Sequence, residues 1–354
     1  MISPVEFLKE LIAVQSFSRE EDGTADLIYS VFEREGFKPR RYKNNVWAVA
    51  DGYDSSRPTL LLNSHHDTVK PSPNYTRNPF EPIVDNGRLY GLGSNDAGAS
   101  AVTLTALFAE MRNVALPFNL ILALTAEEEV TGENGMRAFL PHLKEHGIEI
   151  TMALVGEPTG MQPAVAERGL VVLDCVSRGI AGHAARKDGV NAIYKAIEDI
   201  QRLRTFTFER RSEILGPISV QTTMIQSGSQ HNVVPDECRW VVDVRTTDVY
   251  TNEETVRILQ SVISSEATPR STRVRASVVA SDHPLVKAAL EMRKTPFVSP
   301  TTSDMSQMHA FPSLKMGPGE SSRSHTADEF IELSEIENAI TDYKNYLINL
   351  SKYY

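Results

Sequence analysis

The feature that most constrains the fold is a set of apolar runs that contain no polar alternation. The runs cover residues 59–62, 119–124 and 152–155. A strand with one wet face alternates apolar and polar residues, whereas a strand covered on both faces does not. Segments with helical periodicity separate the runs, so the sequence predicts an α/β fold with a mixed, mainly parallel sheet and flanking helices.

The pattern changes after Gly169, where the strand-like runs alternate between apolar and polar residues. These runs cover residues 170–179, 217–228 and 237–246. Such alternation is typical of an antiparallel sheet with one exposed face. The 354 residues also exceed one core of ordinary size. We therefore expect a main domain, residues 1–168 and 279–354, and an inserted smaller α+β domain, residues 169–278.

Charge and composition argue against two classes of partner. The chain has 36 Lys and Arg against 46 Asp and Glu, a formal net charge of −10, so it would be a poor general nucleic-acid binder. No apolar run has the length of a membrane span, and the N-terminus predicts an amphipathic helix with Pro4 in its first turn. Cys175 and Cys238 lack CxxC spacing and are expected to be reduced and buried. We expect a cytoplasmic protein.

Metal-ligand side chains follow the apolar runs. The first run leads to His65 and Asp67 in "LLLNSHHD", the second to Glu128 and Glu129 in "LILALTAEEE", and the third to Glu157. The carboxyl ends of parallel strands meet at one edge of an open sheet, and ligands bind there. We therefore expect these side chains to converge.

Two more candidates complete this set. Asp96 ends the strand-like "LYGLGSND", and His325 ends "LKMGPGESSRSH". Each candidate has an ordinary alternative: a histidine at a strand end can be a turn residue, an acidic triplet can begin a helix, and Asp96 can cap the helix expected at 97–112. Repeated placement at the same end of the strands favours a shared site over independent surface residues.

Imidazole and carboxylate groups are ordinary zinc ligands. The candidates would give two divalent cations, zinc or alternatively cobalt, two terminal ligands each and one bridging carboxylate. Asp67 is spaced to orient His65 through its second ring nitrogen. One acid of the triplet should remain without a metal, and could move a proton during hydrolysis.

Several segments together resemble the family of dinuclear-zinc amidohydrolases and peptidases that includes acetylornithine deacetylase, succinyl-diaminopimelate desuccinylase, aminoacylase and glutamate carboxypeptidase. The similar segments are "SHHDTV", "LYGLGSNDAG", "LTAEEE", "GEPTGMQPAVAERG" and "GPGESSRSHTADEF". The resemblance implies the following roles: His65 and Glu157 hold one zinc, Glu129 and His325 hold the other, Asp96 bridges them, Asp67 orients His65, and Glu128 is the general base and acid.

The resemblance also implies a role for the smaller domain, as a lid through which two copies form a homodimer. "GIAGHAARKDGVNAI" is similar to the signature of that domain. His183 would reach the active site of the partner subunit and stabilise the oxyanion. "HNVVPDECRWVVDVR" resembles the segment that offers Asn232 and Arg245 to the substrate, where a guanidinium suits a carboxylate.

Within the family, "YTRNPFEPIVDNGRLYGLG" and "GEPTGMQP" are most similar to acetylornithine deacetylases. The implied reaction is deacylation of N-acetyl- or N-succinyl-L-ornithine in arginine biosynthesis. Ala97-Gly98-Ala99 replaces the Met-Lys-Gly of many members, so the acyl group stays open. The alternatives are succinyl-diaminopimelate desuccinylase and a broad aminoacylase or dipeptidase. A zinc-stabilised binding protein is the non-enzymatic alternative, and it would need neither Glu128 nor Asp67.

Overall fold

The structure is a computed structural model that describes residues 3–186 and 188–354. The chain forms two compact units. The first contains Met1–Val165, Val279–Phe297 and Ser303–Tyr354, and the second contains Ala166–Val278 and Val298–Thr302. The first unit has the mixed α/β architecture with a mainly parallel central sheet that the apolar runs predicted, so this fold class is confirmed.

The main sheet is built around parallel strands. Its order is β1-β2-β6-β3-β7-β17-β8-β15, and β16 pairs with β8. The four neighbouring strands β6, β3, β7 and β17 run parallel, and the strands on either side are antiparallel. The strands are β1 (Arg40–Tyr42), β2 (Asn45–Val49), β3 (Thr59–His65), β6 (Asn119–Thr125), β7 (Met152–Val155), β8 (Ala164–Glu167), β15 (Ser277–Val278), β16 (Phe297–Ser299) and β17 (Ser313–Lys315).

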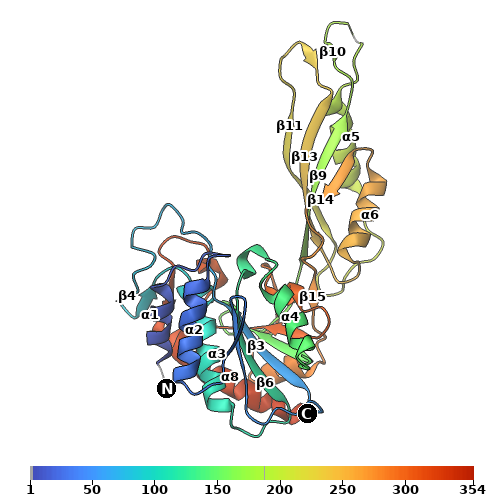
Figure 1. Ribbon diagram of the computed structural model, residues 1–354. Helices are drawn as coiled ribbons and strands as arrows, with labels where there is room; N and C mark the ends of the chain where they lie inside the picture. The colour runs from blue at the N-terminus through green and yellow to red at the C-terminus, as the bar shows by residue number, and fades with distance from the viewer. Residues whose placement is uncertain (1–2, 187) are drawn as a thin grey trace. The chain divides into compact units, whose positions relative to one another are not determined.

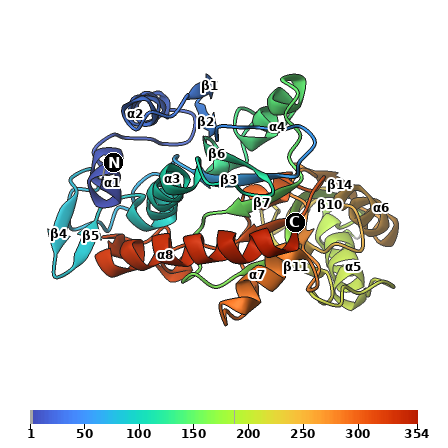
Figure 2. The same cartoon turned by 90° about the horizontal axis from the view of Figure 1, so that it is seen from below.

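Helices cover both faces of this sheet, which explains why β3 shows no polar alternation. Leu60 and Leu62 pack into one core and Leu61 into the other, and all three side chains are fully buried. Figure 2 shows α3 and α8 on one side of β3 and β6, and α4 on the other. The helices of this unit are α1 (Pro4–Ile12), α2 (Asp22–Arg34), α3 (Ala99–Met111), α4 (Met136–Glu145), α7 (Pro284–Glu291) and α8 (Leu333–Leu350).

A second, three-stranded sheet lies in the same unit, in the order β18-β5-β4. It contains β4 (Ile83–Asp85), β5 (Arg88–Tyr90) and β18 (Phe330–Glu332). The convergence of strand ends had suggested that the strand-like residues 88–93 belong to the main sheet. They belong to this second sheet instead. Because β5 pairs with β18, the chain before Asp96 lies beside the chain after His325.

The second unit has a four-stranded antiparallel sheet in the order β11-β13-β9-β14. Figure 1 shows α5 and α6 against one face of this sheet. Cys175 and Cys238 are buried in β9 and β13 and form no disulfide. The elements are β9 (Gly169–Arg178), β10 (Gly182–His183), α5 (Ala192–Thr205), β11 (Ser219–Ser227), β12 (Val233–Val234), β13 (Glu237–Thr246), α6 (Asn252–Val262) and β14 (Glu266–Pro269).

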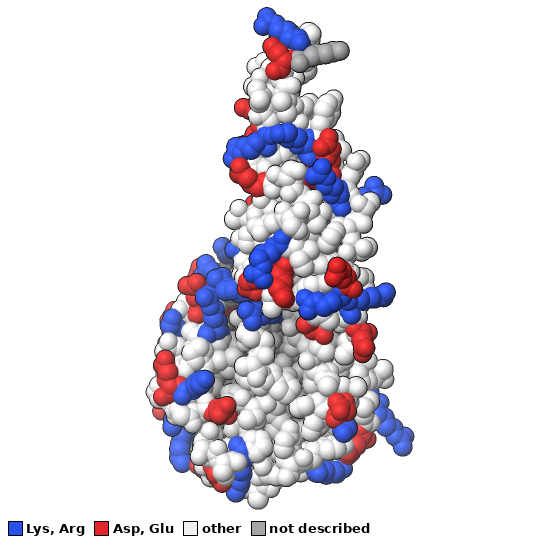
Figure 3. Space-filling model, turned by 90° about the vertical axis from the view of Figure 1, so that its right-hand side faces the viewer, with Lys and Arg blue, Asp and Glu red and all other residues white. Residues whose placement is uncertain are grey.

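The surface and the helices bear on possible partners. On the face drawn in Figure 3, basic and acidic side chains are interspersed, so this face offers no continuous basic track for a phosphate backbone. Among the helices in the described part of the chain, none has both the length and the apolar composition that spanning a bilayer requires.

Candidate metal centre

His65 is the last residue of β3, and acidic side chains surround its outer ring nitrogen. His65 Nε2 lies 3.3 Å from Asp96 Oδ1, 3.7 Å from Glu157 Oε1 and 4.0 Å from Glu128 Oε2. Glu157 comes close because β7 runs parallel to β3 in register, with Asn63 opposite Val155. Four segments that are distant in sequence thus converge at the carboxyl ends of the central strands.

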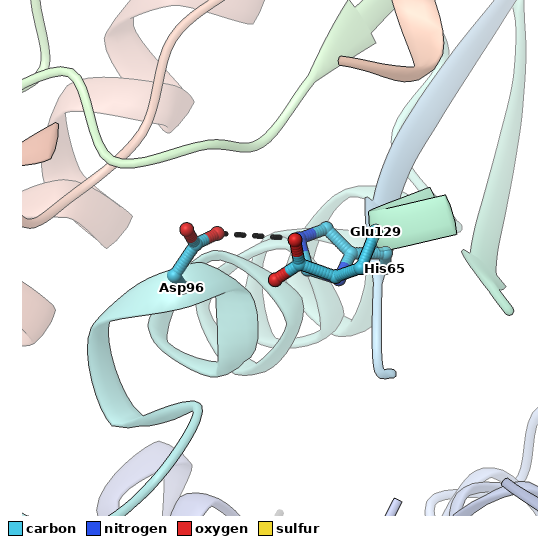
Figure 4. Close-up of side chains that lie close together, drawn as sticks. All are labelled: His65, Asp96 and Glu129. Atoms are coloured by element: carbon cyan, nitrogen blue, oxygen red, sulfur yellow. Dashed lines mark hydrogen bonds and ion pairs between the residues drawn. The ribbon is translucent and has the colours of Figure 1, made fainter. Parts of the chain in front are cut away.

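His325 occupies the other side of Asp96. His325 Nε2 lies 3.0 Å from a carboxylate oxygen of Glu129 and 3.7 Å from Asp96 Oδ2. The two oxygens of Asp96 therefore face two different histidines, which is the arrangement that a bridging carboxylate requires. Figure 4 shows Asp96 and Glu129 directed toward His65. The structure thus brings together all five side chains that the sequence proposed as ligands.

The donor atoms are close enough to share cations. One ligand atom from each of His65, Asp96 and Glu129 lies within 4.8 Å of the other two, and the same holds for His65, Glu128 and Glu157. The atoms are imidazole nitrogens and carboxylate oxygens, the donor set of zinc and similar divalent ions.

The electrostatics of the cluster also fit bound cations. Burial raises the pKa of Glu157 to about 8, and the neighbouring carboxylate of Asp96 adds to the effect. Burial likewise raises the pKa of Glu128 well above its usual range. The hydrogen bond to Glu129 raises the pKa of His325 to about 9. Without added positive charge the cluster holds protons, so cations would replace protons there.

Asp67 supports the cluster from behind. Its carboxylate accepts hydrogen bonds from the backbone N–H of Glu128 (3.0 Å), the backbone N–H of Glu129 (3.2 Å) and Ser18 Oγ (2.7 Å). Burial acts to raise the pKa of Asp67, but His65 and these donors hold it below its usual range. One carboxylate thus fixes the turn that carries both Glu128 and Glu129.

The contact between Asp67 and His65 differs from the expectation. His65 Nδ1 lies 3.0 Å from the backbone oxygen of Asp67 and 3.5 Å from its carboxylate. The expected carboxylate contact is therefore the longer one, because the carboxylate is turned toward the backbone of Glu128 and Glu129. Either oxygen can set the ring orientation of His65, and the orienting role of Asp67 stays a prediction.

The backbone after β6 separates the three glutamates of the acidic triplet. Glu127 has a left-handed backbone with φ 57°, and its carboxylate accepts hydrogen bonds from the backbone N–H and side-chain amide of Asn134. Glu128 and Glu129 are directed to the histidines instead. This turn determines which acids of the triplet can act at the cluster.

Comparison with known proteins identifies the chain. The sequence profile of peptidase family M20/M25/M40 matches residues 61–349. The chain belongs to this family. It is therefore a metal-dependent hydrolase that acts on amide bonds, which confirms the resemblance seen in the motifs and the expected enzyme class.

The curated relatives of this M20 chain include several succinyl-diaminopimelate desuccinylases. The one from Wolbachia pipientis wMel is 28% identical over 72% of this chain and 66% of that protein. The one from Cereibacter sphaeroides is 26% identical over 98% of both chains. These names differ from the acetylornithine deacetylase that the motifs suggested, and they match the stated alternative.

Solved structures of M20 proteins share the fold. A tripeptidase from Staphylococcus aureus has a TM-score of 0.77 at 19% identity and covers 99% of this chain and 98% of its own. The YXEP protein of Bacillus subtilis, described as a dinuclear metal binding peptidase of the M20 family, has a TM-score of 0.71 at 16% identity, with 99% and 98% covered. At these identities the likeness supports the fold alone.

Three predicted residues of the M20 chain belong to the second unit. His183 is exposed, and its Nδ1 accepts the backbone N–H of Ala185 at 3.2 Å. Arg245 donates to the carboxylate of Asp243 at 2.8 and 3.1 Å. Asn232 is exposed. Their roles toward substrate remain predictions.

Three buried polar residues near the centre escaped the sequence reasoning. Asp304 accepts a hydrogen bond from Thr125 Oγ1 at 2.8 Å, and burial raises its pKa to about 6. Asn95 and Glu329 bond to the loops that carry Asp96 and His325. Asn95 and Glu329 lie inside the segments that resemble the family, but loop contacts follow no periodicity, and Asp304 lies outside every such segment.

Proposed function

We propose that this M20 enzyme hydrolyses the amide bond of an N-acyl diamino acid and releases the acyl group as a carboxylate. The observation that carries the proposal is an acid, Glu128, that has a carboxylate oxygen within 4.8 Å of donor atoms of His65 and Glu157, in a cluster suited to two cations. The desuccinylase relatives support a succinylated substrate, and the sequence resemblance supports ornithine as the amine. N-succinyl-LL-diaminopimelate and N-succinyl-L-ornithine are the first candidates.

The proposed centre holds two divalent cations, with zinc as the expected metal and cobalt as a substitute. The ligands of one would be His65 and Glu157, and those of the other Glu129 and His325, with Asp96 shared between them. Bound cations would polarise the amide carbonyl and lower the pKa of water.

Glu128 is proposed to move the proton of the reaction. It would accept the proton of the attacking water and deliver it to the leaving nitrogen, as a general base and then a general acid. Burial raises the pKa of Glu128, and a raised pKa suits a carboxyl group that must accept and release a proton near neutral pH. Its contact with His65 is 4.0 Å, the longest of the three acidic contacts to that ring nitrogen.

The second unit is proposed to pair with a second copy of the chain. Its edge strand β11 exposes Met224 and Ile225, and α5 exposes Tyr194, with exposed fractions of 64%, 54% and 66%. An exposed apolar edge strand commonly indicates an interface. In the dimer, His183 is proposed to act at the partner's active site. Sedimentation of the wild type and of Met224→Lys would test the pairing, and a monomeric wild type would contradict it.

Rates on a substrate panel test the proposed reaction. We would measure kcat/KM with the zinc-loaded enzyme on N-succinyl-LL-diaminopimelate, N-succinyl-L-ornithine, N-acetyl-L-ornithine, a neutral N-acetyl amino acid and a dipeptide. The proposal expects the highest value on one of the first three. Preference for the neutral compound or the dipeptide would favour a broad aminoacylase or dipeptidase. No hydrolysis of any compound, with metals bound, would favour a binding protein.

A further inference from the structure

Two loops of the proposed centre come from distant parts of the sequence but lie together. One follows β5 and carries Asp96 in the turn Ser94–Gly98, and the other precedes β18 and carries His325. Pairing of β5 with β18 brings the loops near each other, with Leu89 opposite Ile331. That pairing ends several residues before Asp96, so other contacts must determine where the two ligands lie.

Glu329 supplies the first of these contacts. Its side chain is buried, and its carboxylate accepts hydrogen bonds from three successive parts of the other loop: the backbone N–H of Gly93 (2.9 Å), Asn95 (2.8 Å) and Asp96 (2.8 Å). Its backbone oxygen also accepts the N–H of Gly91 at 3.0 Å. A single residue of the His325 loop therefore fixes the backbone on both sides of Asn95, including that of Asp96.

Asn95 makes the reciprocal contact. It is fully buried, its Oδ1 accepts the backbone N–H of Glu320 at 3.0 Å, and its Nδ2 donates to the backbone oxygen of Glu320 at 3.1 Å and to Ser324 Oγ at 3.4 Å. A Cβ atom on Gly319 would lie 2.3 Å from Asn95 Oδ1, so the loops are in close contact there. Asn95 of the Asp96 loop thus holds the His325 loop by hydrogen bonds, and Glu329 of the His325 loop holds the Asp96 loop in the same way.

We propose that Glu329 and Asn95 form a two-way clamp that positions Asp96 and His325 for the cation between them. Neither side chain is assigned as a ligand, so both act through the backbone of the ligand-bearing loops. Hydrogen bonds behind metal ligands commonly change metal affinity or activity by about 10–100-fold. The inference rests on the proposed metal centre, because the clamp has no purpose there without cations.

The Glu329→Gln variant tests the clamp. An amide nitrogen cannot accept a hydrogen bond, so at least one of the three N–H groups loses its acceptor. We would titrate the metal-free wild type and variant with Co²⁺ and follow the visible spectrum. The expected result is two bound ions in the wild type and an affinity about 10–100-fold lower in the variant, while circular dichroism stays native.

Asp328→Asn is the matched control. The Asp328 carboxylate also accepts three hydrogen bonds, from the N–H and hydroxyl of Thr76 and the N–H of Arg77. The loop that contains Thr76 and Arg77 carries no proposed ligand. The Co²⁺ affinity of Asp328→Asn should stay within about threefold of wild type. The hydrogen bonds that this variant loses hold a loop without metal ligands, whereas changes in affinity arise from hydrogen bonds that position the ligands themselves. If Glu329→Gln does not fold, Asn95→Ala takes its place, because it removes the acceptor for the N–H of Glu320 and the donors to Glu320 and Ser324 without adding charge, and should weaken Co²⁺ binding similarly.

The outcomes separate the two proposals. Two tightly bound ions in the wild type with unchanged affinity in the folded variant would overturn the clamp and leave the metal centre intact. Equal weakening by Asp328→Asn would also overturn it, since the effect would then be general destabilisation. Absence of Co²⁺ binding in the wild type would overturn the metal centre and the clamp with it.

Discussion

Replacement of Asp67 by Asn is the most direct test of how the centre is held. The Asp67 side chain is fully buried, with one oxygen accepting the N–H of Glu128 and the other accepting the N–H of Glu129 and the hydroxyl of Ser18. The amide of Asn presents one acceptor and one donor. Whichever way the amide turns, a backbone N–H of the turn meets another donor.

The expected magnitude follows from this count. A buried donor left without an acceptor costs about 1–3 kcal/mol. The hydroxyl of Ser18 can turn to accept from the amide, so we count one lost acceptor and predict that the metal-free protein loses about 1–3 kcal/mol of unfolding free energy. Since the same turn carries Glu129 and Asp67 orients His65, metal affinity should fall about 10–100-fold.

Denaturant unfolding of the metal-free protein and competition with a chelator would measure these two effects. Ser18→Ala serves as the control, because it removes a donor to Asp67 and leaves both backbone hydrogen bonds in place. An Asp67→Asn variant with unfolding free energy and metal affinity close to wild type would refute the reasoning. It would mean that the turn keeps its position without the carboxylate.

Four other outcomes are expected. Glu128→Gln should lower kcat at least about 100-fold with both metals retained, measured by metal analysis and steady-state rates. His183→Ala should lower kcat without changing the metal content, and an unchanged kcat would remove it from the mechanism. At pH 7, metal binding should release at least two protons, since Glu157 and His325, with pKa values of about 8 and 9, are protonated before the cations bind and the pKa of the ligand His65 is also raised by its carboxylate neighbours; calorimetry in two buffers would count them. Burial lowers the pKa of His66 to about 4, so the contribution of neutral His66 to stability is complete above pH 6.5 and is lost as the pH falls toward 4. In the metal-free protein, His66→Gln should reduce the slope of unfolding free energy against pH, near pH 5, by about 1.4 kcal/mol per pH unit.

The sequence predicts the ligands on the main sheet because their positions follow from strand geometry. A run such as Leu60–Leu62 is apolar on both faces only if helices cover both sides, and the residue that ends it must then emerge at the sheet edge. His65 ends β3, and Glu157 follows the end of its parallel neighbour β7 by two residues, so their proximity follows from the strand pairing, in which Asn63 lies opposite Val155. The order of apolar runs and polar residues along the chain is therefore enough to predict which side chains meet at this edge.

Other features depend on contacts without a periodic signal. Asp96 reaches the site through the β5–β18 pair, which joins residues more than 200 positions apart and belongs to a separate sheet. Strand β15 contains two residues, Ser277 and Val278, which pair with β8 but are too few to show a period-two pattern. The bonds of Glu329 to Gly93, Asn95 and Asp96 likewise join loops, where neither hydrophobic pattern nor strand register applies.

The environment of Glu128 distinguishes it from Glu129 and Asp96, two of the acids proposed as ligands. Glu129 contacts His325 at 3.0 Å, and Asp96 lies 3.3 and 3.7 Å from the two histidines, so both acids already face a positive or donor group. The Glu128 carboxylate lies 4.0 Å from His65 Nε2, while burial and the charges of Glu157 and Glu129 raise its pKa. Cations held by the other acids would lower the pKa values of those ligands most strongly. Glu128, whose pKa burial raises, would then be affected less than the ligands, and a carboxyl group that can hold a proton near neutral pH is what a proton carrier beside a metal pair requires.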